Sequence, residues 1–196
     1  MKKLFLASTL AAAFIAPAFA GGLNVTAGVA TSSIRETGGS SVSVPQAVLG
    51  LSDQIGPVVV GGTLADGHGE GVHARQLALS AGVPVALSRS AVVTPYAEVG
   101  YDKIGGLTEK HTAAGVNASV AAGPVDLFGG VKVGRSFGVS GAPDALNGTY
   151  LGANAGIGFA AGPGRVQVAY DYTRLPVSAG TNVGASRFTV GYAMTF

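Results

Sequence analysis

Residues that could carry acid–base or metal chemistry are few in this chain. Its three histidines, His68, His73 and His111, fall in or beside segments that we expect to be exposed loops. His68 and His73 lie five residues apart across a glycine-rich stretch, which does not place two metal ligands on one helical face. The one compact set is Asp66, His68 and Glu70, and an enzyme would depend on it because acid–base groups must lie within hydrogen-bond reach. We expect no catalytic site, no metal site and no cofactor.

Charged residues recur instead at alternate positions of apolar segments. Counting every second residue places five of them on the side that carries small and polar residues: Glu98, Asp126, Lys132, Asp171 and Arg187. An unpaired buried charge is costly, so we expect Asp171 to pair with Arg187, and Lys132 to pair with Glu98 or Asp126. The polar residues on the same side are Gln76, Asn117, Asn154 and Gln167.

Composition excludes several classes of protein. The chain has 196 residues and no cysteine, which rules out disulfide-stapled domains and thiolate metal sites. It is 11% charged and 47% hydrophobic, which is too apolar for a disordered chain, and its 32 glycines do not recur at every third position as in collagen. Its mean hydropathy of +0.43 is high for a soluble domain and raises the prospect of a membrane protein.

Residues 1–20 have the pattern of a cleaved secretory signal peptide. Lys2 and Lys3 precede an apolar run, and Ala18 and Ala20 supply small residues at the positions that a signal peptidase reads. Without the two lysines the remaining chain carries 10 basic and 10 acidic residues, so we expect no nucleic-acid partner. Residues 21–196 contain no apolar run as long as a spanning helix, so membrane residence would require a closed β-barrel.

Period-two alternation favours that barrel. In the last segment every second residue is apolar or aromatic, namely Phe188, Val190, Tyr192, Met194 and Phe196. The residues between them are small or polar, whereas a soluble β-sandwich would present Lys and Glu to water. Small inward glycines leave two interpretations of the lumen: a plug of ion pairs and hydrogen bonds, which we favour, or a polar pathway for ions or small solutes. These glycines are Gly115, Gly130, Gly134, Gly152, Gly156, Gly158 and Gly191.

Glycine–proline connections set the number of strands. Four short turns are expected, at residues 55–57, 82–84, 123–124 and 162–164. Five longer polar loops are expected between them, at residues 33–41, 67–71, 103–111, 136–148 and 175–184. Together they predict an all-β, antiparallel up-and-down barrel of ten strands. Eight strands are the alternative, because residues 82–91 show no clear pattern of a turn or a strand. The strands are expected near residues 23–31, 44–52, 58–66, 72–81, 92–102, 112–122, 125–135, 149–160, 165–174 and 185–196.

These features resemble the small outer-membrane β-barrels of Gram-negative bacteria, of the OmpA, OmpX and OmpW type. The alternating final strand that ends in Phe196 carries the resemblance most specifically. It implies an outer-membrane location and recognition of that strand by the barrel-assembly machinery. The chain departs from the pattern in having no Trp, so its aromatic girdles are thin, with Tyr101, Tyr150, Tyr172 and Phe188 expected at one rim.

Three functions remain open for such a barrel. We expect a monomer with a structural or surface-interaction role in envelope integrity or adhesion. The alternative is a narrow channel for ions or small solutes, and a lipid-modifying or proteolytic enzyme ranks third. Arg75 and Arg135 fall on the outward face near the loops, where they belong at the membrane rim. Two interpretations stay open for them: contact with lipopolysaccharide phosphates, or ordinary solvation at the rim.

Overall fold

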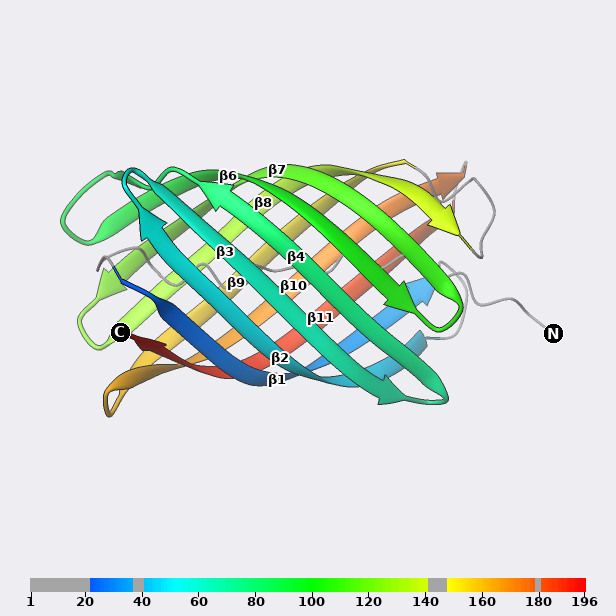
Figure 1. Ribbon diagram of the computed structural model, residues 1–196, viewed down its shortest axis with the longest axis horizontal. Coiled ribbons are helices and arrows are strands. Elements are labelled where there is room, and N and C mark those ends of the chain that lie inside the picture. The colour runs from blue at the N-terminus through cyan, green and yellow to red at the C-terminus, as the bar shows by residue number, and fades with distance from the viewer. Residues whose placement is uncertain (1–21, 37–40, 141–147, 179–180) are drawn as a thin grey trace.

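Ten long strands form one closed antiparallel barrel (Figure 1). The computed structural model describes residues 22–36, 41–140, 148–178 and 181–196; the expected signal peptide lies outside them. Neighbours in sequence pair around the wall, and the ring closes where β1 pairs with β11 and β4 pairs with β6. The ten strands are β1 (Asn24–Glu36), β2 (Ser41–Ile55), β3 (Val58–Gly69), β4 (Val72–Gly82), β6 (Ala91–Ile104), β7 (Leu107–Ala122), β8 (Val125–Ser140), β9 (Thr149–Ala161), β10 (Gly164–Ser178) and β11 (Thr181–Thr195). The prediction of ten strands is confirmed, and the eight-stranded alternative is wrong.

Three of the four predicted turns are two-residue Gly–Pro connections. Ile55 pairs with Val58 across the first of them, and the glycine has positive φ in all three: Gly56, Gly123 and Gly162. The remaining predicted turn, at residues 82–84, is wrong, because the chain does not form a hairpin there. The chain there continues into a two-residue strand, β5 (Val85–Ala86), which pairs with β6 before the chain turns. We call the end of the barrel with these connections the turn end and the opposite end the loop end.

The strands run further toward the loop end than expected. Residues 103–111 were expected to be a loop, but β6 and β7 pair as far as Ile104 and Leu107, leaving only Gly105 and Gly106 between them. The β3–β4 connection is likewise reduced to Glu70 and Gly71, both with positive φ. Polar residues at these strand ends do not break the ladder between β6 and β7, whose residues pair without interruption up to Ile104 and Leu107. Polarity alone therefore misplaced these strand ends.

The two faces of the wall differ in kind. Large apolar side chains are exposed on the outer face, and we call these the apolar belt: Val29, Leu49, Leu64, Leu77, Leu79, Val99, Val116, Val131, Val133 and Leu151. The inner face buries small, polar and charged side chains. Within the described ranges, no helix is long and apolar enough to cross a membrane.

An apolar cluster fills the barrel interior near the loop end. Its buried members come from β1, β2, β4, β6, β7, β9 and β11, so they converge from most of the circumference: Ile34, Val42, Val44, Ala74, Ile104, Ala113, Tyr150 and Ala185. Val72 and Leu107 pack against them. We call this set the apolar layer.

Candidate functional site: the lumen and the outer rim

A hydrogen bond crosses the lumen below the apolar layer. The Nη1 group of Arg187, on β11, donates to Oε1 of Gln76, on β4, over 3.1 Å. β11 and β4 are separated by β1, β2 and β3, so the bond joins walls that are nearly opposite in the ten-stranded ring. The Nε atom of Arg187 also lies 3.7 Å from Oδ2 of Asp171 on the adjacent β10, which confirms the predicted pair.

A second group of charges lies on β6, β7 and β8. Lys132 Nζ donates to Glu98 Oε1 over 2.7 Å, which confirms one of the two partners expected for Lys132. The ring of His111 lies between two carboxylates, with Nδ1 at 3.1 Å from Asp102 Oδ2 and Nε2 at 3.5 Å from Glu98 Oε1. These groups and the Arg187 contacts make up what we call the charged layer.

His111 corrects the expectation that every histidine lies in or beside an exposed loop. It is only 1% exposed and faces inward. Asp102 and Glu109 are also buried, and they are direct cross-strand partners. Sequence reasoning missed Glu109 and His111 because it ended the alternation at the expected loop, and it did not count Asp102, the last residue of the expected strand, among the inward charges. Continuing the same alternation from Glu98 through Asp102, and back through Glu109 and His111, would have placed all of them inside.

Asp126 pairs elsewhere. Its carboxylate contacts the guanidinium of Arg165 near the turn end, so the alternative pairing with Lys132 is wrong. Asn154 Nδ2 donates to Asn117 Oδ1 over 3.3 Å, between β9 and β7. The remaining predicted lumen residue, Gln167, is buried on β10.

Six inward glycines are covered by larger side chains in register with them. His111 lies opposite Gly100, and a Cβ atom at Gly100 would overlap its ring. The same geometry joins Tyr150 to Gly134 and Phe128 to Gly156. Tyr96 with Gly115, Asn117 with Gly130 and Lys132 with Gly152 are further pairs in register. The glycines therefore make room for side chains that lie along the wall, and do not by themselves widen the lumen.

Tyr150 is one of these covering rings. It was expected to belong to an aromatic girdle at the rim, but it is fully buried on the inner face of β9, in the apolar layer. Its ring meets the ring of His111 edge to face, with centroids 6.0 Å apart. The apolar and charged layers are thus in direct contact. Tyr172 and Phe188 are exposed on the outer face as expected.

On the outer rim, Asp66 is bound by partners other than those expected. Its Oδ1 atom lies 2.8 Å from His73 Nε2, and its Oδ2 accepts a hydrogen bond from Arg75 Nε over 2.6 Å. No contact joins it to His68 or Glu70 within the ranges that the structure describes, and Glu70 occupies the β3–β4 turn. Among those residues, no group of three His, Asp, Glu or Cys side chains could hold a metal ion.

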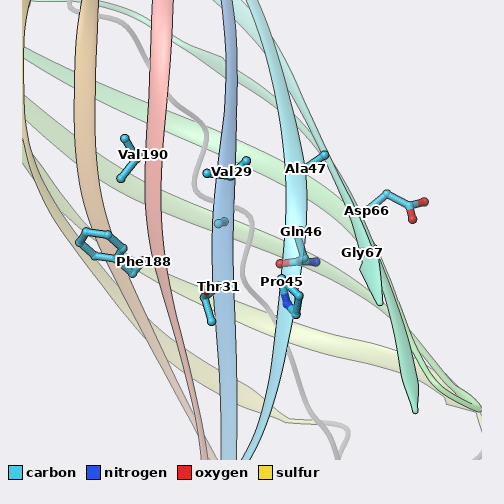
Figure 2. A pocket seen from close by; sticks show the side chains of 10 residues that line it. Val29, Thr31, Pro45, Gln46, Ala47, Asp66, Gly67, Phe188 and Val190 are labelled. Carbon is cyan, nitrogen blue, oxygen red and sulfur yellow. The ribbon is translucent and has the colours of Figure 1, made fainter. Parts of the chain in front are cut away.

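A shallow apolar groove lies on the outer wall beside Asp66 (Figure 2). Its volume is about 580 Å³. The register explains its shape, because Val190, Val29, Ala47 and Asp66 form one cross-strand row over four strands, in which Ala47 is small. A second row, with Phe188 at one end, contributes Thr31 and Pro45. The groove thus opens on the lipid-facing side and is not an entrance to the lumen.

The expected assembly signal occupies β11. Phe188, Val190 and Phe196 are exposed, and Met194 is half-buried. The Tyr192 hydroxyl donates to the Ala161 carbonyl over 2.7 Å. Phe196 extends the wall at its end, since its N–H donates to the Leu23 carbonyl over 2.9 Å.

No protein-family model and no curated protein matches the chain. Solved structures do: the outer membrane protease OmpT from Escherichia coli has a TM-score of 0.55 at 10% identity, over 89% of this chain and 97% of that one. The β domain of the Bordetella autotransporter BrkA has a TM-score of 0.53 at 15% identity, over 90% and 99%. The neisserial surface protein A has a TM-score of 0.47 at 16% identity, over 90% and 98%.

At such identities the likeness to OmpT and BrkA concerns the fold alone. The chain has the fold of outer-membrane β-barrels, which confirms the class expected from the alternation and the final strand.

Proposed function

We propose that this protein is a structural barrel of the bacterial outer membrane whose lumen is closed by its own side chains, and that residues 1–20 direct its export and are removed. The apolar belt supports residence in lipid, because a closed ladder satisfies every backbone group while the belt faces the acyl chains. The surface-interaction role expected from the sequence rests largely on segments 37–40, 141–147 and 179–180, which lie outside the described residues.

The observation that carries the proposal is the hydrogen bond from Arg187 to Gln76 across the lumen. Only side chains that meet from opposite walls can make such a bond, so the barrel is narrow enough at this level for its own residues to fill it. Lys132 and Glu98 join walls two strands apart at the charged layer. The apolar layer lies next to the charged layer on its loop-end side, and a continuous path for ions would have to cross both layers.

Single-channel recording in a planar bilayer tests the closure. The protein without residues 1–20 is refolded in detergent, its folding is checked by its shifted mobility in SDS gels, and it is then inserted. We expect insertion without discrete current steps. A double variant, Arg187→Ala with Tyr150→Ala, removes one bulky side chain from each layer and is expected to conduct. Arg89→Ala, in the exposed turn before β6, is the matched control and should stay silent.

Discrete steps from the wild-type barrel would overturn the proposal and favour the channel. In that case the described lumen has five carboxylates against three lysine and arginine side chains and His111, so cations would be preferred. If the double variant inserts but stays silent, these two layers are not what closes the lumen.

A further inference from the structure

Acidic and basic residues are sorted to opposite faces of the wall on β6 and β7. Asp102 and Glu109 are buried inside, whereas Lys103 and Lys110, the next residue in each strand, are exposed outside. Successive residues of a strand point to opposite faces, so the barrel wall separates each lysine from the carboxylate beside it in sequence. The positive charge on the outer face is therefore not neutralised by its nearest sequence neighbours.

Four outward basic residues follow one another on adjacent strands, and we call them the basic arc: Arg75 on β4, Lys103 on β6, Lys110 on β7 and Arg135 on β8. Arg75 is the direct cross-strand partner of Lys103. Lys110 lies diagonally from Lys103, because Lys110 pairs directly with Tyr101 whereas Lys103 pairs directly with Thr108. Arg135 lies diagonally from Lys110 in the same way. The four side chains thus form a continuous stripe around part of the wall.

Most of this charge lacks a partner within the protein. Arg75 donates to Asp66, but in the part of the chain that the structure describes, Lys103, Lys110 and Arg135 make no ion pair or hydrogen bond through their side chains. Like charges placed directly opposite on paired strands repel each other. A row of this kind is stabilised when an external anion lies between its members.

The position of the basic arc indicates which anion. On the same strands the outward residues toward the turn end belong to the apolar belt, with Leu77 on β4, Val99 on β6, Val116 on β7 and Val133 on β8. The arc begins where this belt ends. A lysine or arginine on the lipid face is tolerated at the interface and disfavoured at the midplane, so the arc belongs at the level of the lipid headgroups. There, guanidinium and ammonium groups bind phosphate.

We propose that the basic arc binds the phosphate groups of the glycolipid in the outer leaflet, with Lys103 and Lys110 bridging between Arg75 and Arg135. This inference rests on the proposed outer-membrane location but not on the closed lumen. The proposed lipid site lies on the outer surface of one part of the wall, formed by β4, β6, β7 and β8. The adjoining sector carries the apolar groove between β11 and β3, and the two meet where Arg75 donates to Asp66.

The test compares lipid retention by refolded barrels in a neutral detergent. Each protein is titrated with purified lipopolysaccharide and with the same lipid after removal of its phosphates, and bound lipid is counted by native mass spectrometry. The triple variant Lys103→Gln, Lys110→Gln, Arg135→Gln is compared with Arg89→Gln, which removes one exposed charge at the turn end. Gel mobility confirms that every variant is folded.

We expect each lysine or arginine near the lipid surface to contribute about fivefold to affinity, so the triple variant should lose about a hundredfold. Arg89→Gln should bind as the wild type does, dephosphorylated lipid should bind weakly to every protein, and added salt should weaken the wild type most. Equal binding of the two lipids, or a triple variant that binds like the wild type, would overturn the proposal. Competition by millimolar pyrophosphate without retention of lipid would show a site for free phosphate and would overturn the lipid assignment.

Discussion

Replacing Gly134 by alanine should destabilise the barrel, although alanine is ordinarily the better strand residue. Gly134 lies opposite Tyr150, and the three nearest atoms to a Cβ built there all belong to the Tyr150 side chain. Tyr150 has no exposed surface and is held in the apolar layer by residues from several strands. Its ring therefore cannot move aside without displacing that layer.

The expected cost is that of overpacking a well-packed interior, about 1 to 3 kcal/mol. The same substitution elsewhere in a strand is worth about 0.5 to 1 kcal/mol in favour of alanine. Gly158 is the matched control, because it also faces inward but its Cβ would lie 3.7 Å from Asp126 and Gln167, an ordinary contact. Gly158→Ala should therefore be neutral or slightly stabilising, so the two substitutions differ in sign.

The assay is reversible urea unfolding of the refolded barrels in lipid vesicles, followed by circular dichroism and by mobility in SDS gels. In a Tyr150→Ala background the added cost of Gly134→Ala should disappear, since the overlapping ring is gone. Equal unfolding midpoints for Gly134→Ala and Gly158→Ala would refute the argument that Gly134 is needed to make room for the inward ring of Tyr150. So would an undiminished cost of Gly134→Ala in the Tyr150→Ala background.

Three further predictions concern other contacts. Arg187→Ala leaves Asp171 buried without its cation and should destabilise the barrel by about 3 kcal/mol, much of it recovered by adding Asp171→Asn; an unaltered unfolding midpoint would show that the pair contributes nothing. Deleting Phe196 should lower the amount of folded barrel in the outer membrane of expressing cells, and undiminished abundance would contradict a role for the terminal residue in assembly. Glu70→Gly should raise stability by about 1 kcal/mol, because Glu70 has a φ of 51° in its turn, and a lower unfolding midpoint would mean that its side chain matters more than its backbone.

The sequence was sufficient for features that depend on a period of two and on neighbouring strands. The outward face of β11 and the Gly–Pro turns follow from local pattern, and the pair Asp171–Arg187 follows because β10 and β11 are consecutive. The bond from Arg187 to Gln76 could not be predicted in this way, because three other strands separate β11 from β4. It depends on the diameter of the closed ring.

Register accounts for the other omissions. To predict that Tyr150 covers Gly134 and that His111 covers Gly100, one must know which residues face each other across the strands. A glycine in the sequence does not indicate which side chain covers it. The sequence displays many inward glycines, from which a wide lumen is as natural an interpretation as a filled one. His111 was misplaced for a simpler reason, since a polar run near a strand end was taken for a loop.

Pairing of β1 with β11 places the two ends of the barrel-forming sequence in one ladder, from Asn24 opposite Thr195 to Glu36 opposite Val183. Until the last strand arrives, the first has an unsatisfied edge, and a chain shortened by that strand would expose two edges, on β1 and β10. In hydrocarbon no water is present to bind those backbone groups, so a partial wall is not a stable intermediate in lipid. Closure of the ladder between β1 and β11 and residence in lipid are therefore coupled.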